Sequence, residues 1–258
     1  MSKIACGTLC FSRLSFSKAC AEIASLGFDA IDLAVMQNWA HFNPSDLVEN
    51  LEDAIDSAQS TLEELGLEVV AFNASAGVSE VGPETERFDA ICRFARALDV
   101  PVVSYVAPVA AVGMERTLRR YERLRDIALE HGILFAVEAH ARTMLEVPEQ
   151  AVAFCEALEY VYLTLDPCHL YAGENQGAPF DILYPYVRHT HWRDGGDAWE
   201  RCQLDVGTGL VDFEGIIERL RDEGYGGAYA VEYIDTFPNG GRRNILAMKR
   251  LLEQYVTE

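Results

Sequence analysis

Short apolar runs alternate with longer amphipathic segments along the whole chain. Eight of these runs are rich in Val, Ile, Phe and Tyr and are nearly continuously apolar, which is typical of strands buried on both faces of a parallel sheet. We predict strands over residues 4–9, 30–35, 68–73, 101–106, 133–139, 161–166, 187–192 and 228–234.

The amphipathic segments between these runs predict helices. We expect them over residues 17–26, 46–65, 85–98, 114–131, 147–158, 212–223 and 243–256. A glycine follows the first, second and fourth of them, at Gly27, Gly66 and Gly132, where a left-handed C-cap would turn the chain back to the sheet.

Two further signals concern the beginnings of helices. Ser45-Asp46 and Asp212 have the residue types favoured at helix N-termini. A helix over about 179–186, between the sixth and seventh strands, is the weakest of the series because Pro179 and Pro185 interrupt it.

Eight strand–helix alternations without a linker or low-complexity tract indicate an α/β fold, a single (β/α)8 TIM barrel. We expect residues 1–258 to form this one domain, since about 250 residues is typical of the fold. An open doubly wound sheet is the alternative. It would need a glycine-rich turn after the first strand to bind a nucleotide, and residues 11–19 contain no glycine.

The amino-acid composition limits which binding partners and which cellular location we expect for the protein. With 21 Lys and Arg against 41 Asp and Glu, the net charge of −20 argues against binding to nucleic acid. The seven cysteines form no CxxC pair, so a zinc ribbon or a redox motif is not indicated. The chain has neither a signal-peptide pattern nor an apolar run of about 18–20 residues, and we expect a cytoplasmic protein with reduced thiols and no membrane partner. Self-association stays open.

The last four predicted strands each end in a residue that can bind a metal ion: Glu138, Asp166, His191 and Glu232. One carboxylate at a strand end is more often a helix cap, but four such residues in consecutive strands are hard to explain in that way. In a barrel these ends meet at one face. The donor set favours Mn²⁺ or Mg²⁺, with Zn²⁺ or Co²⁺ as alternatives, and predicts metal-assisted chemistry on a small oxygen-rich molecule.

Neighbouring residues extend this candidate site. Side chains two apart in a strand share a face, so His140 projects with Glu138, and His189 lies a layer below His191, where a core hydrogen bond is an equally good interpretation. His169, which we expect in a loop after Asp166, can reach a substrate oxygen or a second metal.

Two loops and one helix face have open interpretations. Trp39, in the loop 36–45, either walls the pocket or packs against the next loop. The loop 193–211 contains four glycines and could be a mobile lid, with its GTG stretch more typical of a turn than of a phosphate site. We expect a solvated, ion-paired surface at Arg116, Arg119, Arg120, Arg123 and Arg125.

Several motifs carry a resemblance to a known family. They are VEAH, LTLDPCH, HTHWRD, GTGLVDF and AVEY, together with LGFDAIDL near the start of the chain. From about residue 3 to 252 the chain resembles the sugar isomerase/epimerase superfamily of xylose isomerase-like barrels. This resemblance implies a divalent metal held by Glu138, Asp166, His191 and Glu232, with the two glutamates facing each other across the substrate.

The resemblance also assigns roles to individual residues. His169 matches a substrate-binding histidine, and Arg193 stands where many members have lysine. Its planar guanidinium favours bidentate binding to a carboxylate or phosphate. Asp32 replaces the usual glutamate at the second strand end, and Met144 stands where ketose 3-epimerases have a substrate-binding glutamate. The Asp32 replacement would withdraw or reposition one polar contact, and Met144 weakens the likeness to the 3-epimerases in particular.

We therefore expect an isomerase or epimerase of a ketose or related sugar, acting through an enediolate with Glu138 and Glu232 as acid and base, and with His169, Arg193, His140 and Trp39 binding substrate. The alternatives are a metal-dependent dehydratase of an inositol-like or shikimate-like compound, and a non-catalytic sugar-binding barrel. An apurinic-type endonuclease is disfavoured by the net charge and by Asn73 and Ser104 at earlier strand ends. A GxSxG nucleophile motif is absent.

Overall fold

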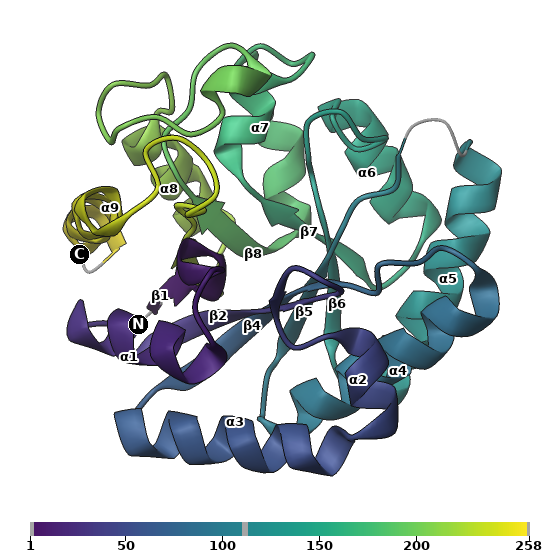
Figure 1. The fold of residues 1–258 in the computed structure, drawn as a ribbon. Coiled ribbons are helices and arrows are strands. Elements are labelled where there is room, and N and C mark those ends of the chain that lie inside the picture. The colour runs from purple at the N-terminus through teal and green to yellow at the C-terminus, as the bar shows by residue number, and fades with distance from the viewer. Residues whose placement is uncertain (1–2, 110–112, 257–258) are drawn as a thin grey trace.

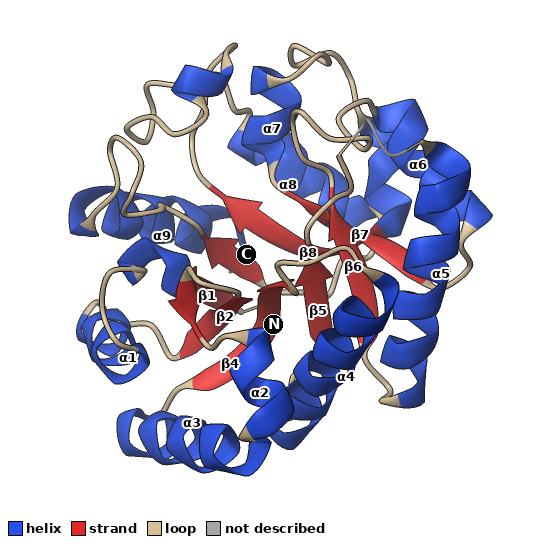
Figure 2. Cartoon of the chain, turned by 45° about the vertical axis from the view of Figure 1, so that its right-hand side comes forward, coloured by secondary structure: helices blue, strands red, loops and turns tan. Residues whose placement is uncertain are grey.

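Eight parallel strands pair in a ring, and helices surround them on the outside (Figure 1 and Figure 2). The computed structural model describes residues 3–109 and 113–256. The strand order is β1-β9-β8-β7-β6-β5-β4-β2, and a β1–β2 pair closes the ring, with the short β3 (Ala40–His41) antiparallel to β2. The predicted (β/α)8 TIM barrel is confirmed.

All eight predicted strands are present, with bounds that differ by a few residues. They are β1 (Ile4–Gly7), β2 (Ala30–Met36), β4 (Glu68–Ser75), β5 (Val102–Tyr105), β6 (Leu134–Glu138), β7 (Val161–Leu165), β8 (Val187–Trp192) and β9 (Tyr229–Val231). Asp166 and Glu232 therefore come directly after their strands, whereas Glu138 is the last residue of its strand.

The helices also follow the predicted order. They are α1 (Phe16–Ser25), α2 (Pro44–Glu49), α3 (Leu51–Leu65), α4 (Val81–Ala97), α5 (Met114–Glu130), α6 (Pro148–Ala157), α7 (Pro167–Ala172), α8 (Phe213–Asp222) and α9 (Arg242–Val256), with short 3₁₀ segments η1 (Thr8–Phe11), η3 (Asp181–Tyr186) and η4 (Trp199–Arg201). Among the described residues, no helix has both the length and the apolar character needed to cross a membrane.

The predicted caps are partly right. Gly27, Gly66 and Gly132 have φ values of 78°, 64° and 70°, the left-handed conformation that glycine adopts without steric cost. Asp212 caps α8 by accepting a hydrogen bond from the Gly215 N–H. Ser45 is not an N-cap, because α2 begins at Pro44.

Three helix predictions need correction. The expected helix 46–65 is two helices, because Asn50 leaves the helical conformation with φ −134° and ψ 45°. The segment 179–186 forms only the 3₁₀ segment η3, which includes Pro185. Residues 167–172 were expected as a loop but form α7, so His169 lies on a helix.

Small side chains fill the barrel interior beneath the residues at the carboxyl ends of the strands. Strand alternation places Ala136 on the same face as Glu138, and Ala230 on the same face as Glu232. Two small clusters of buried residues result, which contain Ala5, Ala30 and Ala230, and Ala71, Val102 and Ala136. Large apolar side chains such as Phe135 belong instead to the main core. The interior thus leaves room for polar groups at the carboxyl ends of the strands.

One arginine on α5 differs from the expected solvated surface. Nε of Arg120 donates to Oε2 of Glu84 on α4 at 2.7 Å, and the Glu84 side chain is only 1% exposed. The Tyr105 hydroxyl donates to the same carboxylate. Arg120 therefore joins α5 to α4 through a mostly buried ion pair, whereas Arg119 pairs with Glu115 at the surface.

Candidate active site and metal centre

Three of the four predicted metal ligands converge inside the barrel mouth. Oε1 of Glu138 lies 3.2 Å from Nδ1 of His191, and Oε1 of Glu232 lies 3.7 Å from the same nitrogen. The three ligand atoms are all within 4.8 Å of one another. Strand alternation explains the convergence. Glu138 and His191 lie at the carboxyl ends of β6 and β8, Glu232 directly follows β9, and all three side chains project into the barrel.

Asp32 on β2 fixes the orientation of the His191 ring. Oδ2 of Asp32 lies 2.8 Å from Nε2 of His191 and 2.9 Å from Nε2 of His189. With Nε2 engaged in this way, Nδ1 of His191 is the nitrogen that faces the two glutamates. His189 is buried beside Asp32, as expected for a residue one layer below His191.

Asn73 on β4 holds the second glutamate. Its Nδ2 donates to Oε1 of Glu232 at 2.9 Å. The other oxygen of Glu232 faces Arg193, whose guanidinium nitrogen lies 3.5 Å away. Neither Asp32 nor Asn73 was predicted in these roles. Asn73 lies near the carboxyl end of β4, whereas Asp32, which was expected at a strand end, is the third residue of β2 (Ala30–Met36).

Both oxygens of Asp166 contact groups of its own chain. Its Oδ1 accepts from the Cys168 N–H at 3.0 Å and so caps α7. Its Oδ2 accepts from Nε of Arg193 at 2.9 Å and lies 2.8 Å from a terminal nitrogen of the same guanidinium in an ion pair. Oδ1 of Asp166 is therefore a helix cap, and Oδ2 is the oxygen to which the metal-ligand interpretation applies. Asp166 borders the Glu138–His191–Glu232 group through Arg193.

The electrostatics of the two glutamates differ. Burial by itself would raise the pKa of Glu138, but the hydrogen bond with His191 and the charges of nearby histidines lower that pKa below its ordinary value. Burial raises the pKa of Glu232 to about 7, and the charges of Glu138 and Asp166 add to the effect against the opposing charges of His191 and Arg193. Negative charge is therefore crowded at this point.

The donor set fits a divalent cation. Two carboxylates and one imidazole nitrogen face one another, and a cation among them would offset the burial and the carboxylate repulsion that together raise the pKa of Glu232. Asp32 completes the arrangement, because metal-binding histidines usually donate their other N–H to a carboxylate. Oxygen-rich sets of this kind suit Mg²⁺ or Mn²⁺.

A cavity of about 520 Å³ opens above these residues. It is lined by Glu138 and Glu232 and by all four predicted substrate-binding residues, His140, His169, Arg193 and Trp39. Apolar residues that the sequence analysis did not single out make up much of the remaining wall; they are Leu9, Met36, Val106, Ile234, Phe237 and Pro238.

The histidines at one wall stack closely. The ring centroids of His140 and His169 are 3.7 Å apart, and the His169 ring stacks on Trp199 of the loop after β8. Nε2 of His169 lies 3.0 Å from a terminal nitrogen of Arg193, which fixes it as an acceptor. Burial lowers the pKa of His169 well below its ordinary value, and the charges of His140 and Arg193 lower it further.

The glycines of the loop 193–211 bind a carboxylate of the same chain. Oδ2 of Asp194 accepts from the N–H groups of Gly207 and Gly209 at 2.8 and 2.9 Å. Asp194 also bridges to Leu204. The GTG stretch is therefore a turn around Asp194, as the sequence favoured over a phosphate site.

Met144 takes no part in the cavity wall. It is buried, and its sulfur accepts a hydrogen bond from the Thr117 hydroxyl of α5. The position at which the resemblance would place a substrate-binding glutamate is thus occupied by a core residue.

Comparisons with known proteins agree with this architecture. Residues 20–251 match a family model described as xylose isomerase-like TIM barrel. Among curated proteins, none matches the chain in sequence.

Solved structures show the same fold at low identity. A xylose isomerase-like TIM barrel protein from Mycobacterium smegmatis in complex with magnesium is 18% identical, with a TM-score of 0.81 over 100% of this chain and 97% of that one. A D-psicose 3-epimerase in the presence of D-fructose is 16% identical (TM-score 0.75, 99% and 100% covered). The probable 3-DHS dehydratase of petrobactin synthesis from Bacillus anthracis is 14% identical (TM-score 0.72, 99% of both chains).

Proposed function

Because this chain belongs to the xylose isomerase-like TIM barrel family, we propose that it is a divalent-metal-dependent isomerase or epimerase of a ketose or a related polyhydroxy carbonyl compound. The observation that carries the proposal is the meeting of Glu138, His191 and Glu232 beside a cavity large enough for a sugar. Similar folds described as D-psicose 3-epimerase and D-tagatose 3-epimerase-like protein support the same reaction class.

We propose Glu138, Asp166, His191 and Glu232 as the residues that hold the cation. A bound divalent cation would stabilise negative charge developing on the carbonyl and adjacent hydroxyl oxygens of the substrate, an effect worth several kcal/mol. Asp32 keeps Nδ1 of His191 directed at this position, and Asn73 does the same for one oxygen of Glu232.

The proton transfers belong to the two glutamates. One carboxylate removes the proton from the carbon next to the carbonyl, which gives an enediolate, and the other returns a proton. Return to the opposite face of that carbon is epimerisation, and return to the neighbouring carbon is isomerisation. Both carboxylates line the cavity, so both can reach a substrate carbon.

Substrate recognition is assigned to residues around this pair. His169 and His140 provide ring nitrogens at one wall, and Trp39 provides an aromatic face at the mouth, where its side chain is 45% exposed. Arg193 forms ion pairs with Asp166 and Glu232, and these carboxylates orient the guanidinium that would contact the substrate.

A dehydratase is the second candidate, and the burial of Met144 favours it. With Met144 in the core, the chain lacks a carboxylate at the position where ketose 3-epimerases are expected to bind substrate. A similar fold carries the description of a probable 3-DHS dehydratase. In this case one glutamate would remove the proton, and the β-hydroxyl would take a proton from the other glutamate and leave as water. The conjugated product absorbs in the ultraviolet.

The test is a screen of the Mn²⁺-loaded protein against ketoses and polyols in D₂O, followed by NMR and absorbance. Incorporation of deuterium at one carbon, with no other change in the mass of the sugar, supports the isomerase or epimerase. A new ultraviolet absorbance together with the loss of one water from the substrate supports the dehydratase. Saturable binding of a sugar without exchange or elimination would contradict both and leave a non-catalytic sugar-binding barrel.

A further inference from the structure

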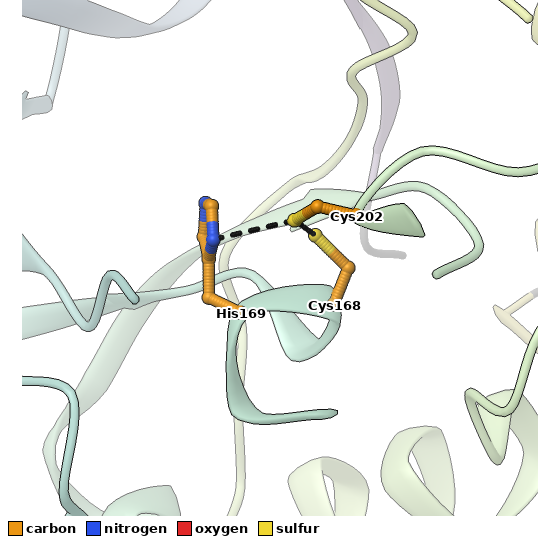
Figure 3. Close-up of side chains that lie close together, drawn as sticks. All are labelled: Cys168, His169 and Cys202. Atoms are coloured by element: carbon orange, nitrogen blue, oxygen red, sulfur yellow. Dashed lines mark hydrogen bonds between the residues drawn. The ribbon is translucent and has the colours of Figure 1, made fainter. Parts of the chain in front are cut away.

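Two cysteine sulfurs lie in contact at the wall of the cavity, outside the metal-ligand set. Sγ of Cys168, in the first turn of α7, is 2.9 Å from Sγ of Cys202, which follows η4 in the loop after β8 (Figure 3). Nδ1 of His169 lies 3.5 Å from Sγ of Cys202. Both thiols are free and both residues are buried.

The distance between the sulfurs decides what this pair can become. Two thiolates bound to one tetrahedral zinc ion at about 2.3 Å would lie about 3.8 Å apart. The observed 2.9 Å is much shorter than that. A disulfide requires about 2.05 Å, so the sulfurs need to approach by only about 0.9 Å.

The backbone on both sides keeps the sulfurs together. A Cβ on Gly195 would lie only 2.7 Å from Cβ of Cys168, so the start of the loop packs directly on this cysteine. Backbone hydrogen bonds between Gly196 and Arg201, and between Cys202 and Trp199, hold the segment that carries Cys202.

We propose that Cys168 and Cys202 are a site of reversible oxidation, at which a disulfide ties the loop after β8 to α7 next to His169. Cys202 lines the cavity, so a small peroxide can reach its sulfur through the same opening that admits substrate. Cys168 is fully buried behind it and acts as the resolving thiol.

The chemistry balances with hydrogen peroxide as the oxidant. The Cys202 thiol gives up two electrons to the peroxide O–O bond, which yields the sulfenic acid and one water. The Cys168 sulfur then attacks the Cys202 sulfur; the S–S bond forms, the S–O bond breaks, and the thiol proton leaves with the hydroxyl as a second water. In total two thiols lose two hydrogens to one peroxide. A dithiol such as dithiothreitol reverses the reaction by exchange.

The crosslink restrains residues that line the cavity. Trp199, Glu200 and Gln203 flank Cys202 and are part of the wall, as is His169 beside Cys168. A covalent bond between the two segments therefore limits movement of this wall. Because the readouts below need no substrate, the inference stands or falls independently of the proposed reaction.

The test treats the reduced full-length protein with hydrogen peroxide and uses intact mass, peptide mapping and hydrogen exchange. We expect a loss of about 2 Da, a crosslinked peptide pair that contains Cys168 and Cys202, and slower exchange over residues 196–204, all reversed by dithiothreitol. Cys168→Ser and Cys202→Ser should each abolish the crosslink, whereas Cys155→Ser on α6 should keep it.

Three outcomes would overturn the proposal. The first is a crosslink that instead joins Cys6 on β1 to Cys10 on η1, the other pair of buried cysteines close in sequence. The second is sulfinic acid at Cys202 with Cys168 still free. The third is stoichiometric zinc that the reduced wild-type protein retains and Cys202→Ser does not. The wild-type map alone decides the first two, so the proposal stays testable even where a serine variant fails to fold.

Discussion

Oδ2 of Asp32 contacts Nε2 of His191 at 2.8 Å, and this contact leaves Nδ1 of His191 directed at Glu138 and Glu232. Asp32 is buried on β2, which lies opposite β7 in the ring of strands. The carboxylate therefore sets which nitrogen of His191 is available as a ligand, without itself belonging to the proposed ligand set.

Replacing Asp32 by Asn tests this positioning role. Both histidines contact the same oxygen of Asp32, and an amide in place of the carboxylate removes the negative charge that strengthens these two hydrogen bonds. We expect Mn²⁺ affinity to fall about 10–100-fold with the fold retained, as measured by titration calorimetry and circular dichroism. Asp29→Asn, three residues earlier and exposed, is the matched control. Equal affinity in Asp32→Asn and wild type would remove Asp32 from the site.

Glu138→Gln and Glu232→Gln test the two proton-transfer groups. Each substitution keeps the size of the side chain but removes the base, so exchange of substrate hydrogen with D₂O should fall about 10²–10⁴-fold in either variant. The measurement is NMR on the substrate found in the screen, with the exposed Glu130→Gln as control. Undiminished exchange in either active-site variant would refute the two-carboxylate scheme.

Arg193→Met tests the charge balance of the metal-free site. Arg193 is buried between Asp166 and Glu232, and removing one partner of a buried ion pair leaves uncompensated charge. The free energy of unfolding without metal should fall by about 3–5 kcal/mol in urea titration.

The matched control for that variant is Arg201→Met in the same loop. Arg201 pairs with Asp197 at the surface, where both side chains are about half exposed, so the expected change is within about 1 kcal/mol. Similar stabilities for the Arg193 and Arg201 variants would show that Asp166 and Glu232 do not depend on the guanidinium.

Trp39→Ala tests the aromatic wall. Because Trp39 lines the mouth of the cavity and is distant in the chain from both glutamates, its loss should raise KM roughly 10-fold while kcat changes little. Tyr160→Ala, an exposed aromatic residue outside the cavity lining, should leave both constants unchanged. A fall in kcat at constant KM would assign Trp39 to the chemical step instead.

Local sequence patterns were sufficient to predict the barrel. Apolar runs identified all eight strands, and glycines at 27, 66 and 132 marked helix ends because their left-handed φ values are costly for other residues. The six-residue α7 was missed, although Asp166 followed by Pro167 is a known signal for a helix start. A helix this short has no amphipathic period to detect.

The sequence predicted the features of the site that follow from strand alternation. It did not predict the contacts between residues on distant strands of the barrel. Alternation placed His189 under His191, and both are found on one face near Asp32. The contact of Asp32 with His189 joins residues 157 positions apart, and that of Asn73 with Glu232 joins residues 159 apart. The burial of Arg120 with Glu84 is equally non-local, which is why its helix face alone suggested solvent. Such pairs depend on barrel closure rather than on local pattern.

The most direct test of the account is anomalous diffraction from crystals of the protein soaked in Mn²⁺. We predict one strong manganese peak within bonding distance of Glu138, Asp166, His191 and Glu232, with Nδ1 of His191 as the nitrogen ligand and Nε2 still on Asp32. A peak that none of these four side chains touches, or an absence of manganese from the barrel mouth at saturating concentration, would contradict it.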